Sequence, residues 1–154
     1  MGIENNENKS FCSSCKGACC KSQSGINSPY DFGKTRKEIK AEIVRFIKSG
    51  FYAIDYWESE SDNESVTYWV RPAHKNALGK IIDASCGGEC RLLNENGCSL
   101  KFQERPYQCK TLIPKDYITR TSKKGGCFQP VSKENMRDIW APFQKMMNSI
   151  IKGL

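Results

Sequence analysis

A chain of 154 residues with a formal net charge of +7 and nine cysteines has room for one domain, and its thiol content is its most unusual property. No apolar run approaches the roughly 18 residues that a membrane span requires, and the polar N-terminus lacks the apolar segment of a secretory signal. A disulfide framework is disfavoured, because nine thiols cannot all pair and nothing indicates export. We therefore expect a cytoplasmic protein, without membrane contact, whose cysteines bind metal.

The basic excess does not by itself indicate nucleic acid. Ligating thiols are deprotonated, so a centre with four thiolates carries about −2 overall, and two such centres would offset much of the positive charge. We expect a protein or peptide partner and regard nucleic acid as disfavoured. The sequence leaves the oligomeric state open.

The N-terminal region carries the first cysteine cluster. Residues 1–10 are polar and predict a disordered N-terminus, followed by a single cysteine-cluster domain over residues 11–154. The cluster reads Cys12-Ser13-Ser14-Cys15-Lys16-Gly17-Ala18-Cys19-Cys20. Two intervening residues let a chain turn so that both sulfurs face one ion. Adjacent side chains of an extended chain point opposite ways, so either Cys19 or Cys20 is not a ligand, or the two serve neighbouring centres.

An amphipathic helix is predicted over residues 36–49. Thr35 and Glu38 have the spacing of a capping box, and Gly50 stands where the helix would end. Apolar residues recur between them at helical spacing: Ile39, Ile43, Phe46 and Ile47. The basic residues of the segment fall mostly off this stripe and are expected to form a solvated face: Lys37, Lys40, Arg45 and Lys48.

Two antiparallel strands are predicted over residues 51–57 and 66–71, which are aromatic and β-branched and flank an acidic polar stretch. A third short strand is predicted over residues 80–83. We expect the aromatic residues of the first two strands to fill a small core or to shield a metal site: Tyr52, Trp57, Tyr68 and Trp69. The only histidine, His74, lies in a polar stretch and is expected to be exposed.

A second cysteine cluster fills residues 86–127, a stretch rich in turn-forming residues. Loop-rich chain buries little apolar area, so we expect metal ligation to supply its order. Its cysteines are Cys86, Cys90, Cys98, Cys109 and Cys127. Beyond it a helix is predicted over about residues 132–152, with Ser132 as its N-cap and a kink or break at Pro142.

These elements predict an α+β fold: a small, cysteine-rich, loop-rich, metal-stabilised domain with a short antiparallel sheet, an amphipathic helix and a C-terminal helix. All nine cysteines are candidate ligands: Cys12, Cys15, Cys19, Cys20, Cys86, Cys90, Cys98, Cys109 and Cys127. Two centres of four thiolates use all but one of them. We expect Cys86 and Cys127 both to ligate, and Cys19 or Cys20 to be the spare thiol or the ligand of a second centre.

Two motifs carry a resemblance to a known family. The first cluster has the spacing CxxCxxxCC, and the second contains Cys90-Arg91-Leu92-Leu93, Asn96-Gly97-Cys98-Ser99-Leu100 and Glu104-Arg105-Pro106 before Cys109-Lys110. Over about residues 12–114 this pattern resembles the YkgJ-like cysteine-cluster family, described as a zinc- or iron-chelating domain. The segment 101–103 is one residue longer than in the family, and Lys110 stands where arginine is common.

The resemblance implies a metal-binding domain and supplies no reaction. Some members of the family are linked to iron–sulfur clusters or to lysine methylation of flagellin. The present chain has no glycine-rich nucleotide loop after a clear strand that would hold a methyl donor. Within the second motif, Arg105 is expected to orient a ligand rather than to contact a substrate.

All-cysteine ligation with dense spacing and a vicinal pair favours iron–sulfur chemistry, one or two 4Fe–4S clusters, with zinc as the alternative. The favoured function is a cytoplasmic metalloprotein that is redox-active or that acts as an enzyme on a peptide or protein. The alternative is a structural zinc-binding module that mediates contact with a partner or nucleic acid. Whether the protein is an enzyme is left open, and no catalytic residue is assigned.

Overall fold

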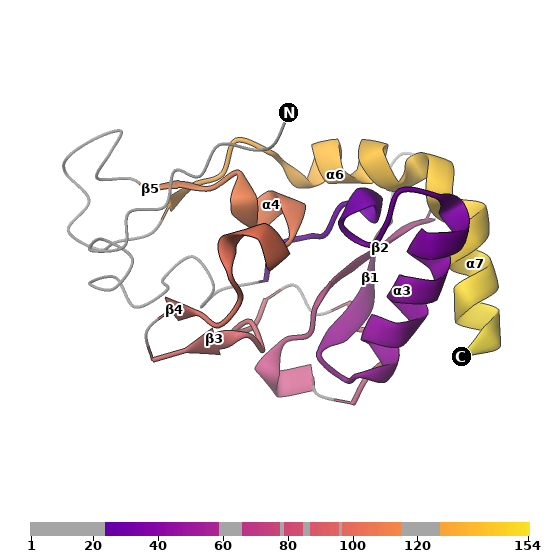
Figure 1. The fold of residues 1–154 in the computed structure, drawn as a ribbon, viewed down its shortest axis with the longest axis horizontal. Coiled ribbons are helices and arrows are strands. Elements are labelled where there is room, and N and C mark those ends of the chain that lie inside the picture. Colours follow the sequence, from indigo (N-terminus) through magenta and orange to yellow (C-terminus); the bar gives the residue numbers. More distant parts are fainter. Residues whose placement is uncertain (1–23, 59–65, 78, 85–86, 96, 115–126) are drawn as a thin grey trace.

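The computed structural model describes residues 24–58, 66–77, 79–84, 87–95, 97–114 and 127–154. Three helices gather around a two-stranded hairpin at one end of the molecule, and a short helix with several small strands occupies the other end (Figure 1). The expected α+β class with a short antiparallel sheet is therefore confirmed. No helix among the described residues is long and apolar enough to cross a membrane.

The hairpin consists of β1 (Tyr52–Glu58) and β2 (Val66–Pro72), which pair antiparallel. Both predicted strands are confirmed, and the segment 59–65 that joins them lies outside the described residues. The third predicted strand is wrong in extent, because residues 80–83 form only an isolated parallel bridge between Ile54 and Ile82. Ile81 and Ile82 are 43% and 42% exposed, so the segment has no buried apolar face that would stabilise a longer pairing.

Helix α3 (Arg36–Lys48) begins at Thr35, whose hydroxyl accepts the backbone N–H of Glu38 while the Glu38 carboxylate accepts that of Thr35. Beyond its end, Gly50 adopts a φ of 83°, which an L side chain rarely tolerates. The predicted helix and its capping box are confirmed. Its buried residues are the isoleucines of the predicted stripe: Ile39, Ile43 and Ile47.

The C-terminal region folds as α6 (Lys133–Trp140), the 3₁₀ turn η4 (Ala141–Phe143) and α7 (Gln144–Gly153). Ser132 caps α6 by accepting the backbone N–H of Asn135. Pro142 lies within η4, because its missing N–H and its ring prevent a continuous α-helix there. The predicted N-cap and the predicted break are both confirmed.

The hydrophobic core lies between α3, the hairpin and the two C-terminal helices. Tyr52 and Trp69 are buried in it, while Trp57 and Tyr68 are half-buried and pack against it, so the predicted core role of these aromatics is confirmed. The helical side contributes further large buried residues: Met136, Trp140, Phe143, Met147 and Ile150. We call α3, the hairpin, α6, η4 and α7 the helical half.

The remaining elements are short. They are η1 (Pro29–Asp31), η2 (Lys75–Ala77), β3 (Leu93–Asn94), β4 (Gly97–Cys98), η3 (Phe102–Glu104), α4 (Tyr107–Lys110), β5 (Ile113–Pro114) and β6 (Cys127–Phe128). The described strands thus form three separate two-stranded sheets, β1–β2, β3–β4 and β5–β6, where one sheet was expected. We call residues 87–114, within the described ranges, the cysteine half; it has the loop-rich character that its turn residues predict.

Candidate cysteine site

Cys90 is held by backbone pairing with the chain that leaves β2. It forms an antiparallel bridge with His74, and the flanking bonds join Lys75 N to Glu89 O at 2.8 Å and Arg91 N to Ala73 O at 2.8 Å. The Cys90 side chain is only 5% exposed. A Cβ at Gly88 would lie 2.8 Å from the Cβ of His74, so glycine is required for this close approach of the two segments.

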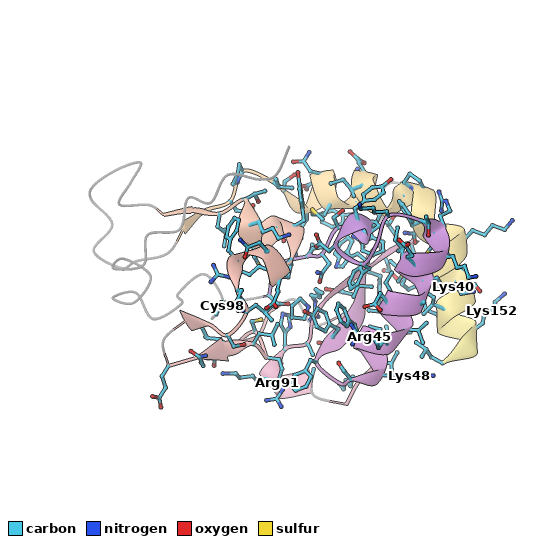
Figure 2. The ribbon with its side chains drawn as sticks, viewed as in Figure 1. Lys40, Arg45, Lys48, Arg91, Cys98 and Lys152 are labelled. Atoms are coloured by element: carbon cyan, nitrogen blue, oxygen red, sulfur yellow. The ribbon has the colours of Figure 1, made fainter. Side chains whose placement is uncertain are left out.

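Cys98 lies in β4 opposite Leu93, within a hairpin whose turn includes Gly97 at a φ of 110°. Leu93 is buried with Cys90, and Ser99 N donates to Leu92 O at 2.8 Å. The hairpin thus brings the half-buried Cys98 to the same region as Cys90. In Figure 2, Cys98 lies at the end of the molecule away from α3 and α7.

Cys109 lies in α4, against the chain that follows the first cysteine cluster. We call residues 24–31 the arm. A Cβ at Gly25 would collide with the Sγ of Cys109, so the arm passes directly over this thiol. Gln108 fixes the arm twice: its side-chain Oε1 accepts Ile26 N–H at 2.9 Å, and its own N–H donates to Ile26 O at 3.2 Å.

Asp31 ends the arm and supplies the start of α4 with a hydrogen-bond acceptor. The N-cap position of α4 is Pro106, which has no side-chain acceptor, and Asp31 Oδ2 instead accepts the Tyr107 N–H at 2.8 Å. The same oxygen accepts Ser28 N–H at 2.9 Å. Burial raises the pKa of Asp31, even though both backbone bonds favour the charged form.

The other edge of the arm is bonded to β2 and to the chain beyond it. Asn27 N donates to Val70 O at 3.0 Å, and Ser24 Oγ donates to Pro72 O at 2.7 Å. Ser24 N donates to Nε2 of His74 at 3.1 Å. The arm therefore lies between the segment that pairs with Cys90 and the helix that carries Cys109.

Tyr52, at the start of β1, is buried in the hydrophobic core. Burial raises the pKa of the Tyr52 phenol far above its ordinary value, and negative charge on Cys90, Cys98 and Cys109 raises it further. The three cysteines therefore lie on the side of the core where Tyr52 is buried, although the described side chains do not form a three-ligand group there. The ring of Tyr52 stacks on Phe46 of α3 at 4.8 Å between centroids, which links the site to the helical half.

A buried network of charged groups lies beneath the segment that pairs with Cys90. Arg71, 2% exposed, bonds to Asp55 at 2.8 Å and to Asp83 at 3.1 Å. His74 is also 2% exposed, with its Nδ1 at 3.8 Å from Asp83 Oδ2. Burial, followed by the nearby Arg71, lowers the pKa of His74, which agrees with Nε2 acting as an acceptor.

The expectation that His74 is exposed is therefore wrong. The polar residues next to His74 in sequence suggested exposure, but the groups that surround it, Ser24, Asp55 and Asp83, come from other segments of the chain. A small polar pocket adjoins it, lined among others by Ser24, Arg71, Gln108 and Lys133.

The described residues do not complete a metal site by themselves. Within the described ranges, no group of three or more His, Cys, Asp or Glu side chains is close enough to hold a metal ion. Five candidate ligands lie outside the described residues: Cys12, Cys15, Cys19, Cys20 and Cys86. For Cys127, the backbone in β6 pairs with Pro114, five positions beyond Cys109.

Gln129 connects β6 to α4, because its Nε2 donates to Gln108 O at 2.9 Å. Arg105 donates from Nε to Leu100 O at 3.1 Å, a bond that fixes the loop between Cys98 and Cys109. Sequence reasoning missed Asp31, Gln108 and Gln129. Of these, Asp31 left a signal, since Ser28 and Asp31 have the spacing of a capping box and form one.

Comparison of the chain with protein-family models, with curated proteins and with solved structures gave no match. The likeness to the YkgJ-like family accordingly rests on the cysteine motifs, and what it implies belongs to the proposal that follows.

Proposed function

We propose that Cys90, Cys98 and Cys109, together with cysteines of the first cluster, bind a metal centre through thiolates, and that the centre is an iron–sulfur cluster. One observation carries the proposal. Cys90 and Cys98 both adjoin Leu93, and Cys109 lies on α4 directly against Gly25 of the arm that follows the first cysteine cluster. This arrangement supports shared ligation, because it brings the chain that follows the first cluster to a thiol of the second.

The arm supports a link between the two clusters. Gly25 contacts Cys109, and Cys20 precedes Gly25 by five residues. Five residues of fully extended chain span at most about 18 Å, so covalent connection alone keeps the first cluster within reach of the second. A centre that takes ligands from both clusters would join the N-terminal segment to the domain.

The donor chemistry fits a thiolate-bound centre. Cys90 is buried while Cys98 and Cys109 are half-buried, which limits access of water to the sulfurs. Cationic residues of the cysteine half would offset the negative charge of a cluster: Arg91, Lys101, Arg105 and Lys110. Nε2 of His74 already accepts the Ser24 N–H, so a mixed site that includes this nitrogen would have to break a buried bond.

An iron–sulfur cluster supplies one-electron chemistry when it is bound. The roles of the chain's own residues follow from their contacts. Tyr52 and Leu93 cover the site with apolar surface, and Gln108 and Asp31 hold the Cys109 helix in place. The favoured function remains a redox protein or an enzyme on a peptide or protein substrate, and the alternative is a structural zinc module.

Anaerobic purification followed by iron, sulfide and zinc analysis and by visible absorption tests the proposal. We expect iron with matching sulfide and a broad visible absorption that bleaches on reduction. Stoichiometric zinc without iron would contradict an iron–sulfur cluster and support the alternative, a structural zinc module. A metal-free protein that stays fully folded under reducing conditions would contradict metal binding altogether.

Single Cys→Ser variants at Cys90, Cys98 and Cys109 then identify ligands. Each is expected to lower the metal content per chain or to make the metal labile to a chelator. Ala77→Ser is the matched control, because it adds a hydroxyl at a buried position without removing a thiol. It should keep the metal content of the unmodified protein.

A further inference from the structure

Helices α3 and α7 lie side by side and run in the same direction at one end of the molecule (Figure 1). Near their starts, the Arg36 guanidinium donates to Pro142 O at 3.3 Å. Further along, Lys40 Nζ donates to Ser149 Oγ at 2.9 Å. The two helices therefore present one continuous surface, and its exposed lysines define what we call the cationic face: Lys37, Lys40, Lys48, Lys145 and Lys152.

Acidic side chains are kept away from the cationic face. At about 100° per residue, the three lysines of α3 fall within an arc of about 80° on the side towards α7. Glu38 and Glu42 lie about 120° and about 160° round the helix from the centre of this arc, and Glu42 pairs with Arg45 at 2.7 Å. The segment 141–154 contains no aspartate or glutamate. Among the described ion pairs, none involves a lysine of the cationic face.

We propose that the cationic face binds the phosphate backbone of nucleic acid. The row from Lys37 to Lys48 extends over eleven residues of helix, or about 16 Å, which matches about five steps of a duplex at about 3.4 Å each. Five exposed ammonium groups that form no ion pair within the described part of the chain suit contacts to phosphates, which position a protein without reading the sequence. The charge pattern along the sequence does not reveal the cationic face, because its lysines come from two helices that are distant in sequence.

The composition of the face argues against other polyanionic partners. Protein interfaces are enriched in aromatic residues, methionine and arginine and depleted in lysine, and this face is lysine with polar neighbours such as Asn148 and Ser149. A membrane surface requires apolar residues that enter the lipid. Among the exposed large hydrophobic residues in the described part of the chain, Phe51, Leu154 and Tyr30, whose ring contacts Phe143 before α7, lie near the ends of these helices rather than between the lysines.

The cationic face is independent of the cysteine site. Figure 2 shows Lys40, Lys48 and Lys152 on the side of the molecule away from Cys98. Both helices belong to the helical half, whose order comes from its apolar core. Binding of nucleic acid should therefore persist in Cys→Ser variants that lose metal, and failure of the metal proposal would leave this one intact.

Fluorescence anisotropy with a labelled DNA duplex of about 20 base pairs tests the proposal on the full chain, from about 50 to about 200 mM salt. With five phosphate contacts, the logarithm of the association constant should fall with the logarithm of salt concentration with a slope of about −4. The double variant Lys40→Ala/Lys48→Ala should make the slope shallower by about 2, and Lys40→Glu/Lys48→Glu should weaken binding at least about tenfold.

Lys75→Glu/Lys80→Glu is the matched control, since it changes the net charge equally at exposed lysines outside the face. It should weaken binding much less than the variant of the face. Equal weakening would attribute binding to overall charge and overturn the proposal. Absence of duplex binding at about 50 mM salt would also overturn it, and binding only to vesicles of phosphatidylcholine and phosphatidylserine would assign the face to membranes instead.

Discussion

The two halves of the molecule owe their order to different forces. In the helical half, large residues such as Trp140, Met147 and Ile43 are fully buried against one another. In the described part of the cysteine half, the buried hydrophobic residues are Cys90 and Leu93, and much of the order comes from hydrogen bonds to the arm and to the chain beyond β2. The comparison indicates that the helical half can fold on apolar packing, while the cysteine half depends on a further source of stability, for which we propose metal.

Metal removal should produce the largest difference in amide protection between the two halves. Binding at a small thiolate site contributes on the order of 10 kcal/mol to folding, so chelation should abolish amide protection in residues 87–114. The helical half should keep its protection, because its core contains none of the candidate ligands. Hydrogen exchange measured before and after chelation checks this, and unchanged protection in residues 87–114 would contradict it.

The largest effect of a single substitution is expected for Trp140→Ala. The side chain is fully buried, and its indole N–H donates to Asn27 O at 2.7 Å, so the change removes packing and strands a buried carbonyl. The free energy of unfolding should fall by about 3–5 kcal/mol, as measured by urea denaturation. Trp57→Ala, at a half-buried position, serves as the control and should cost clearly less; an equal cost would argue against a core centred on Trp140.

A smaller loss is expected for Gln108→Ala. Its side chain accepts the Ile26 N–H and donates to Val131 O, so truncation leaves two backbone groups without these partners. The expected cost is about 2–3 kcal/mol, with increased exchange in the arm. Gln103→Ala is the matched control, since Gln103 is exposed in η3. If the two variants behave alike, Gln108 does not hold the arm to α4.

The smallest expected effect concerns pH. The folded state holds the pKa of His74 below its ordinary value, through burial first and then Arg71, so folding favours the neutral imidazole. The contribution is fully present above about pH 6.5, the ordinary value, and is lost as pH falls towards the lowered pKa. Comparing denaturation of the unmodified protein and of His74→Gln at several pH values checks this. If both lose stability equally between pH values on either side of 6.5, His74 is not responsible.

Local signals predicted the helical half well. The capping box of Thr35 and Glu38, the N-cap Ser132 and the break at Pro142 act within a few residues of where they occur. The candidate cysteines could likewise be named from their spacing. The placement of Cys109 against the arm could not be predicted, because it depends on long-range contacts between α4 and residues 24–31.

The roles of His74 and Gln108 were unpredictable for a related reason. A polar residue in a polar stretch is normally exposed, and only its partners reveal that it is buried. Those partners are 50 residues away for His74, in Ser24, and 82 residues away for Gln108, in Ile26. The prediction of a strand over residues 80–83 was wrong for the opposite reason. The sequence favours pairing, but Ile81 and Ile82 stay exposed in the structure.

The hydrogen bond from Trp140 to Asn27 spans 113 positions of the chain, and this has a consequence for synthesis. At about 5–20 residues per second, the ribosome takes roughly 6 to 23 s to add Trp140 after it has added Asn27. Until then the arm lacks its hydrogen bond from Trp140. The thiols of the first cluster, which precede the arm in sequence, are made before all the other cysteines. The bonds from the arm to Val70 and Gln108 involve residues made earlier, so the Trp140 bond is a late addition that fixes an arm already paired with β2 and α4.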